Sequence, residues 1–296
     1  MLKSPDWGFL VDVYFFVGGI AAGAYFTAAL TDLLGTERDR PVAKLGYFIA
    51  LPLVVLCPIL LTADLGVPGR TFNMLRIFKF GSPMSVGSWA LLGLGFFAAL
   101  SVAALVLEDR RRRQDPRASL ALFRRPVAVL GGLFGFFIAS YPGVLLAASN
   151  RPLWAATNFL GLLFLAVGAS TGIAAIALLL SLRGGDVGES LAKVRRAYTL
   201  ALVMQILALG LVLWQMSAGS PQALRALALV WSGPYSLQFW GGAVVLGLAA
   251  PLAIELGDGL LTGYPRRARG LVVLSALLIL LGGYLTKYLV MVAGQA

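Results

Sequence analysis

The sequence contains no histidine and a single cysteine, Cys57, among its 296 residues. Membrane haems of the b type are held by pairs of histidines, and iron–sulfur clusters need several thiolates, so the chain by itself excludes both kinds of centre. The common histidine-based metal sites and an internal disulfide are excluded on the same grounds. We therefore expect no haem, no iron–sulfur cluster and no metal in this chain. If the protein handles electrons, the redox centre is supplied from outside it.

Charged residues are also scarce. They make up 12% of the sequence, whereas 59% of the residues are hydrophobic. This is too little charge to cover a soluble globule, but it suits a surface solvated by lipid. Crossing about 30 Å of hydrocarbon needs about 20 helical residues, and backbone in lipid must be helical because lipid offers no hydrogen bonds. Eight charge-free stretches approach or exceed that length: residues 13–31, 45–63, 80–107, 126–150, 152–182, 197–224, 226–254 and 270–286.

These stretches predict an all-α, polytopic membrane protein with eight transmembrane helices. We expect two four-helix bundles, residues 1–150 and 151–296, and we expect the first stretch to be a retained helix rather than a cleaved signal. Gly19 and Gly23 in the first helix have counterparts in Gly168 and Gly172 of the fifth, at a spacing that lets helices approach closely. Two interpretations stay open, an internal repeat or two ordinary packing faces.

The distribution of basic residues predicts the orientation. Of the 24 Lys and Arg, 17 fall in the connections after the first, third, fifth and seventh helices. Short loops rich in these residues stay in the cytoplasm. We therefore expect both termini on the outer, periplasmic side of a bacterial inner membrane, and Asp32 and Glu255 at the cytoplasmic interface. Because the excess of positive charge follows the topology, we expect membrane lipid but no nucleic acid as a partner.

Five polar residues fall at about one level, in the outer third of the predicted bilayer: Asp12, Tyr14, Asp64, Tyr141 and Lys287. Ionisable groups are costly in hydrocarbon, and those present there commonly serve a function. The alternative is structural, with interfacial aspartates, a lysine that reaches outward and tyrosines of an aromatic belt.

The predicted outer loop between the second and third helices carries three cations, Arg70, Arg76 and Lys79. Topology rules disfavour positive charge on this face. An acidic partner protein or an anionic substrate would explain them, and a solvated loop is the alternative. We predict that these residues contribute to partner docking.

Six segments resemble the NrfD-like membrane subunits, a family typified by the polysulfide reductase membrane anchor. They occur in order over nearly the whole chain: FFVGGIAAG, DLGVPGR, SPMSVGSW, YPGVLLAASNRPLW, FWGGAVVLGLAAP and YLTKYLVMVAGQ. The resemblance implies a non-haem, quinone-reactive subunit of a respiratory oxidoreductase complex. Such a subunit binds a quinone, menaquinone or ubiquinone, near the outer face. It exchanges electrons with a periplasmic, ferredoxin-like iron–sulfur subunit, which in turn serves a catalytic subunit that is often molybdopterin-dependent.

The resemblance also implies roles for particular residues. Tyr141 matches the family's quinone-site tyrosine, and Asp12 and Tyr14 are the nearest matches to polar residues of the first helix that line the site. Lys287 stands where relatives often have arginine, and the histidine that some relatives carry in the first helix is absent. We expect quinone binding by Tyr141, Tyr14, Asp12 and Lys287, and proton transfer by Asp64 or Asp12.

Two other functions are compatible with the sequence. Pro52 and Pro58 in the second helix and Pro251 in the seventh would bend those helices, as in a secondary transporter. A passive membrane anchor without bound quinone is the other alternative.

Overall fold

The computed structural model describes residues 7–66, 69, 76–115, 119–149, 151–183, 188–262 and 269–295. The regular structure in these ranges is helical, and eight helices are long and apolar enough to cross a membrane. The predicted fold class, all-α with eight membrane helices, is therefore confirmed. The long helices are α1 (Phe9–Leu34), α2 (Arg40–Asp64), α4 (Pro83–Arg112), α5 (Ala121–Ala147), α7 (Leu160–Leu182), α8 (Gly188–Ser217), the joined η3 (Gln238–Ala249) and α10 (Ala250–Thr262), and α11 (Arg269–Gln295).

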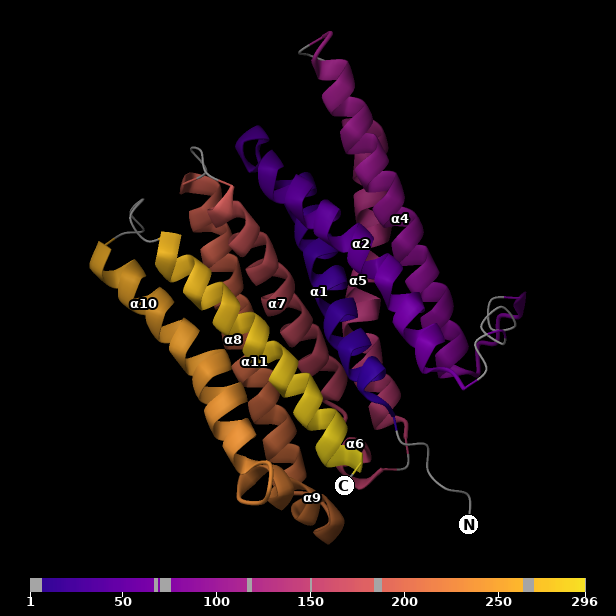
Figure 1. Cartoon of the computed structure of the whole chain (residues 1–296), viewed down its shortest axis with the longest axis vertical. Coiled ribbons are helices and arrows are strands. Elements are labelled where there is room, and N and C mark those ends of the chain that lie inside the picture. The colour runs from indigo at the N-terminus through magenta and orange to yellow at the C-terminus, as the bar shows by residue number, and fades with distance from the viewer. Residues whose placement is uncertain are drawn as a thin grey trace.

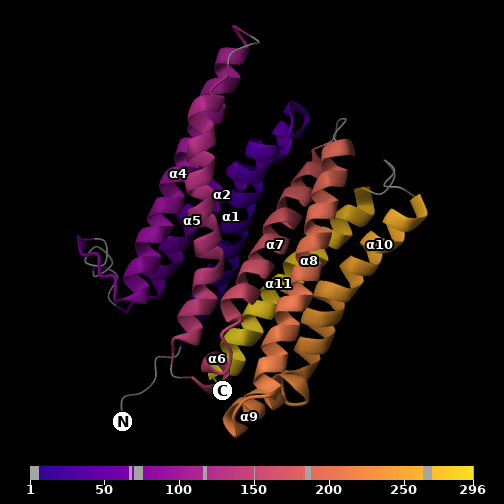
Figure 2. The same ribbon diagram turned by 180° about the vertical axis from the view of Figure 1, so that it is seen from behind.

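The long helices run side by side, so the molecule has two ends (Figures 1 and 2). One end holds Trp7, Gln295 and two short helices, α6 (Pro152–Ala155) and α9 (Pro221–Trp231), and we call it the terminal end. The other holds the 3-10 helix η1 (Glu37–Asp39) and the run of arginines that closes α4, and we call it the basic end. The assignment of the terminal end to the periplasm stays a prediction.

Two apolar stretches of the sequence are interrupted in the structure. The fifth stretch begins as α6 and breaks before α7, where Thr157 donates to Gln215 Oε1 at 2.8 Å and the Asn158 N–H donates to the same oxygen at 2.9 Å. These side-chain bonds compete with the helical ladder. The sixth stretch, residues 197–224, is interrupted after α8, where a new helix, α9, begins at Pro221. Ser220 caps α9, because its hydroxyl accepts from the Ala223 N–H.

The seventh membrane helix begins as a π-helix, η3, and continues as α10. At the junction the Ala250 N–H donates to the carbonyl of Val245, which is the i→i+5 pattern. Pro251 follows at once and has no N–H to donate. Four residues before Pro251, a Cβ placed on Gly247 would lie 2.5 Å from the Cα of Gly282. The backbones of η3 and α11 therefore come into close contact at these two glycines.

Helix α1 lies at the centre of the molecule and contacts α2, α5, α7 and α11. A Cβ on Gly23 would lie 3.2 Å from the Cα of Gly172 and would overlap the carbonyl of Gly168, and one on Gly19 would lie 3.6 Å from the Cα of Gly168. The two glycine pairs are therefore opposite sides of one α1–α7 contact. The glycines are therefore packing positions, and the internal repeat stays a prediction.

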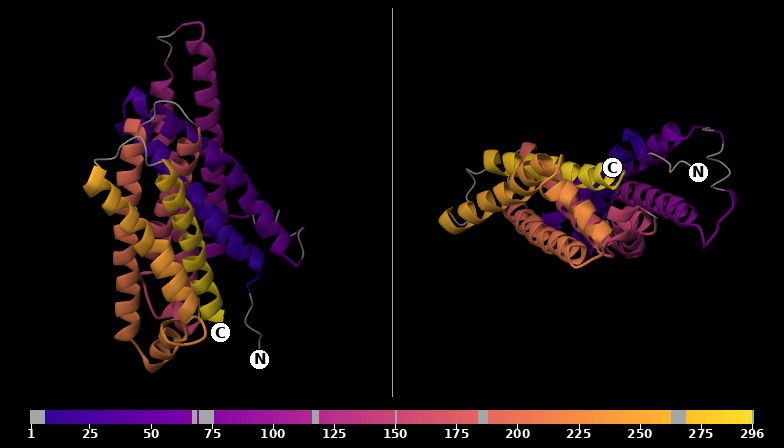
Figure 3. Two further views of the ribbon diagram at one scale, coloured as in Figure 1. Left: turned by 60° about the vertical axis from the view of Figure 1, so that its left-hand side comes forward. Right: turned by 90° about the horizontal axis from the view of Figure 1, so that it is seen from below.

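The predicted division into two halves stays a prediction. In the first half, α2 and α5 each contact both α1 and α4, and in the second, α8 and α11 each contact both α7 and α10 (Figure 3). However, α1 and α5 also pack extensively on α7, across the proposed boundary.

We predict that Gly23→Leu destabilises the protein, because the added side chain would separate α1 from α7. Overpacking commonly costs about 1–3 kcal/mol, and a backbone contact leaves less room to adapt than a side-chain contact. The matched control is Gly210→Leu in α8, where an added Cβ meets no atom within 4 Å. Thermal unfolding in detergent should show a lower midpoint for Gly23→Leu only, and equal midpoints would contradict the close contact.

Candidate functional site

Lys287 is buried near the terminal end, where α11 meets α1 and α7. Its side chain is 1% exposed, and Nζ donates to the Phe15 carbonyl at 2.8 Å. The ammonium also lies 5.2 Å from the centroid of the Phe164 ring, within cation–π range. Gly19 makes this position possible, since a Cβ there would overlap Nζ. Within the described residues no carboxylate lies within ion-pair distance of Lys287.

Tyr14 and Cys57 lie beside Lys287, on either side of Gly18. A Cβ on Gly18 would lie 3.5 Å from Cys57 Sγ and 3.7 Å from the Tyr14 ring. Cys57 lies near Lys287 and Tyr14, and Tyr14 lies near Tyr141. Four groups from α1, α2, α5 and α11 therefore share one buried region.

Tyr141 closes this region towards α4. Its hydroxyl donates to the Pro83 carbonyl at 2.7 Å, in the first turn of α4. Its ring lies over Gly87, where any side chain would collide with it, and Phe137 stacks on it at 5.6 Å between ring centroids. The phenol oxygen keeps a lone pair that can accept a further hydrogen bond.

The two aspartates form a second, adjacent group. Asp12 is 6% exposed, and its Oδ1 has no hydrogen-bond partner among the described residues. Asp64 is the last residue of α2 and lies against Gly8, the residue before α1. The two carboxylates lie near each other, and Tyr284 of α11 lies near Asp12. The structure thus brings the five predicted residues to one end but does not pair Asp12 with Lys287.

A set of contacts that sequence reasoning missed ties the two ends of the described chain together at this site. The Trp7 N–H donates to Gln295 Oε1 at 2.6 Å, and Trp154 Nε1 donates to the Val290 carbonyl at 2.7 Å. Trp7 in turn packs on Phe15 and Trp154, at 5.8 and 5.9 Å between ring centroids. Trp154 lies in one of the segments noted above and Val290 in another, but the two are 136 positions apart, so the sequence does not show that they meet.

Two of the three proposed docking residues lie at the same end as Tyr141. Arg76 and Lys79 are exposed, in the segment that leads into α4, and Arg70 lies outside the described residues. The segment projects to the side of α4 (Figure 1). It is held there by the Lys79 N–H, which donates to Ser85 Oγ at 3.0 Å, and by Phe78, whose ring lies 5.9 Å from that of Trp89.

The side chains of Asp32 and Glu255, which we expect at the cytoplasmic interface, are both buried and paired. Asp32 binds Arg124, and Glu255 accepts from Arg195 Nε at 2.8 Å and from the Tyr198 hydroxyl. No local pattern indicated these partners, because Arg195 lies 60 positions from Glu255.

The chemistry available at the terminal end is that of hydrogen bonding and proton exchange. Over the ranges that the structure describes, no group of three or more His, Cys, Asp or Glu side chains gathers to hold a metal ion. What does gather is an ammonium, two phenols and two carboxylates, against aromatic rings.

Comparison with known proteins gives the chain its family. The sequence matches the family described as "Polysulphide reductase, NrfD" over residues 1–296. It is 27% identical to one of the chains of the polysulfide reductase from Wolinella succinogenes and 24% identical to "Protein NrfD homolog" of Haemophilus influenzae, with 98% of this chain and 94% of each relative covered. A shorter match, 26% identical over 106 residues, covers 36% of this chain and 24% of a putative membrane subunit of dimethyl sulfoxide reductase from Halobacterium salinarum. Since the family match spans the whole chain, the protein belongs to the polysulphide reductase NrfD family.

Proposed function

We propose that this chain is the quinone-binding membrane subunit of a respiratory oxidoreductase complex. It would exchange electrons between the membrane quinone pool and an iron–sulfur subunit at the terminal end. The observation that carries the proposal is Lys287, a buried ammonium that the described structure pairs with a carbonyl and a ring instead of a carboxylate. Burying an ionisable group in this state is costly, and such groups in membrane helices usually serve a function.

The residues present fit a quinone. A quinone ring is flat and apolar, with an oxygen at each end that accepts hydrogen bonds. Phe15 and Phe164 supply apolar, aromatic surface beside Lys287, and the ammonium has three N–H donors, one of which goes to the Phe15 carbonyl. Tyr14 of α1 adds a hydroxyl as a further hydrogen-bonding group near Cys57 and Tyr141. When bound, a quinone supplies redox chemistry of two electrons and two protons.

Within this proposal the residues divide the work by their chemistry. Lys287 donates to an oxygen of the ligand and stabilises negative charge on that oxygen. Tyr14 has a hydroxyl that can donate to an oxygen of the ring. The Tyr141 hydroxyl donates to the Pro83 carbonyl, so its oxygen would accept from a hydroxyl of the quinol. Asp12, whose Oδ1 has no hydrogen-bond partner among the described residues, and Asp64, at the exposed end of α2, would pass protons between the buried region and the outer surface.

The partners follow from the same arrangement. The sequence has no histidine and a single cysteine, so we propose that the electrons pass to a centre in another subunit, close to the quinone. We propose that this is a ferredoxin-like iron–sulfur subunit in the periplasm, docked on the terminal end, and that a catalytic subunit, molybdopterin-dependent in our proposal, completes the complex. Two of the relatives are named as one chain of a polysulfide reductase and as a membrane subunit of dimethyl sulfoxide reductase, which supports a multi-subunit assembly.

We expect Tyr141→Phe to raise the apparent KM for quinol roughly tenfold, because one hydrogen bond to the ligand is lost. The assay is quinol-linked turnover of the assembled complex. Tyr47→Phe is the matched control, a buried tyrosine in the half of α2 nearest the basic end, which packs on Tyr25. Equal KM values for the two variants would argue against Tyr141 as a ligand.

We expect Asp12→Asn and Asp64→Asn to slow maximal turnover about tenfold or more while the complex still assembles, since each removes a group that can carry a proton. Turnover should be measured with saturating quinol, with subunit stoichiometry as the measure of assembly. Near-normal rates in both variants would exclude these carboxylates as essential proton carriers.

We expect the double variant Arg76→Glu, Lys79→Glu to weaken assembly with the iron–sulfur subunit, most visibly as salt is raised. The control is Arg110→Glu, Arg111→Glu, a reversal of two exposed charges at the basic end. Unchanged co-purification of the first variant would remove these cations from the docking surface. Co-purification lost equally in both would point to net charge instead.

A further inference from the structure

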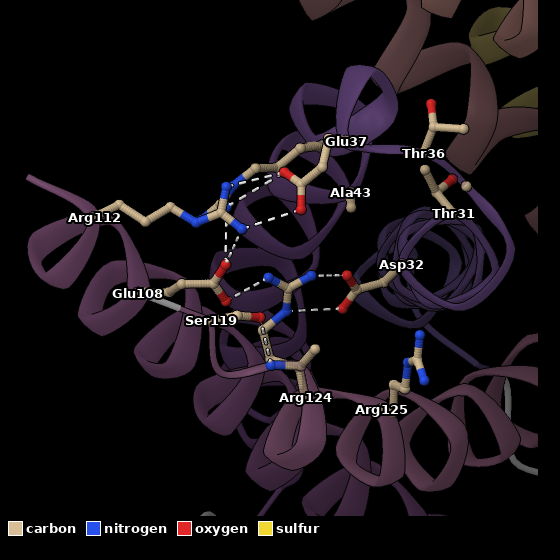
Figure 4. Close-up of a pocket in the computed structure, with 13 residues that line it drawn as sticks. Thr31, Asp32, Thr36, Glu37, Ala43, Glu108, Arg112, Ser119, Arg124 and Arg125 are labelled. Atoms are coloured by element: carbon tan, nitrogen blue, oxygen red, sulfur yellow. Dashed lines mark hydrogen bonds and ion pairs between the residues drawn. The ribbon is translucent and has the colours of Figure 1, made fainter. Parts of the chain in front are cut away.

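A pocket of about 190 Å³ opens at the basic end, away from the site described above (Figure 4). It is formed where α1 ends, α2 begins, α4 ends and α5 begins, which is the level at which these helices leave the apolar part of the bundle. A water molecule's share of liquid volume is about 30 Å³, so the space is large enough for a phosphate group with several waters.

One wall of the pocket is an ion-pair network that is internally balanced. Glu108, whose side chain is 1% exposed, accepts from Arg40 at 2.9 Å, Arg112 at 2.8 Å and Arg124 at 2.6 Å. Arg124 also binds Asp32, and Arg40 also binds Asp109 at 2.9 Å. Over the part of the chain that the structure describes, these ion pairs join four carboxylates to four cations: Asp32, Glu37, Glu108 and Asp109 with Arg40, Lys44, Arg112 and Arg124.

Arg125 lines the same pocket but lies outside this network. It is exposed, and within the described residues it makes no ion pair or hydrogen bond; Figure 4 shows its guanidinium apart from the dashed contacts. The hydroxyl of Ser119, which accepts from the Ala121 N–H at 3.2 Å, also lines the pocket and can donate. Since the network is already neutral, Arg125 gives the pocket one uncompensated positive charge and so favours an anion.

The surroundings of Arg125 indicate what kind of anion this is. Val129 and Leu133 follow it at i+4 and i+8, on the same face of α5, and are 46% and 62% exposed. This face therefore leads from the guanidinium straight into an apolar, lipid-facing surface. Arg110, Arg111 and Arg113 are exposed at the same end of the bundle and add to the positive field. A ligand with an anionic head and long apolar tails satisfies both surfaces at once.

We propose that this pocket binds the phosphate of an anionic phospholipid, with Arg125 and Ser119 contacting the phosphate and the acyl chains lying along α5. Basic pockets between membrane helices are a known means of holding lipid headgroups. Arg gives a planar, bidentate contact to phosphate, which a zwitterionic headgroup would weaken by bringing its own cation. The bound lipid would join α5 to the ends of α1 and α4 that surround the pocket.

The test is native mass spectrometry of the purified full chain with added phosphatidylglycerol, phosphatidylcholine or inorganic phosphate. We expect phosphatidylglycerol to bind in preference to phosphatidylcholine, and Arg125→Gln to weaken its binding about fivefold, which corresponds to the ~1 kcal/mol that one basic residue contributes near a membrane surface. The matched control is Arg110→Gln, an exposed arginine that does not line the pocket, and its binding should stay close to that of the wild type.

Three results would overturn the proposal. Equal losses in Arg125→Gln and Arg110→Gln would mean a diffuse positive field rather than a site. Equal binding of the two lipids would mean that the pocket does not distinguish an anionic headgroup from a zwitterionic one. Displacement of phosphatidylglycerol by millimolar inorganic phosphate would mean that the pocket is a site for a soluble anion, with no part for the acyl chains. A thermal unfolding midpoint for Arg125→Gln equal to that of the wild type without lipid would show that the variant is folded and that its loss is one of binding.

Discussion

The close contact of α1 with α7 is the constraint on which the rest of the structure depends. In a membrane, lipid tails are as apolar as leucine, so helices associate through tight packing and hydrogen bonds instead of the hydrophobic effect. Gly19 and Gly23 on α1 and Gly168 and Gly172 on α7 allow the backbones to meet. With α7 on one side of it, α1 has its remaining faces covered by α2, α5 and α11. A larger side chain at this contact would separate the helices that supply the candidate site.

Glycines of α1 also determine the chemistry at the terminal end. Gly19 leaves open the space that the ammonium of Lys287 occupies, and so lets it reach the carbonyl of Phe15. Gly18 sits between Tyr14 and Cys57 in the same way. Helix packing and site geometry are therefore not separate features, because the residues that bring α1 against its neighbours also admit a buried cation and the phenols beside it.

The two ends of the molecule handle charge in opposite ways. At the basic end, carboxylates and cations compensate one another around Glu108, which is how buried ions are ordinarily tolerated. At the terminal end, Lys287 and Asp12 are both buried, yet the described structure does not pair them. Groups left in this state are suited to a ligand that brings hydrogen-bond acceptors and exchanges protons, which agrees with the quinone function proposed for this member of the NrfD family.

The amino-acid sequence by itself determined the fold class and the eight membrane helices, because hydropathy and helix length are local properties that lipid enforces on each segment separately. Six segments in order indicated the family. It also indicated that Asp12, Tyr14, Tyr141 and Lys287 belong together, since depth in a membrane follows from position along a helix. Only the tertiary structure decided which residues each of them contacts, such as the Phe15 carbonyl for Lys287 and the Pro83 carbonyl for Tyr141. The pairing of Trp7 with Gln295, the partners of Glu108 and Glu255, the break between α6 and α7 and the π-helical start of the seventh helix all depend on residues far apart in the chain or on the packing around them. Such contacts are set by the rotation and crossing of whole helices, which no periodicity within one helix specifies.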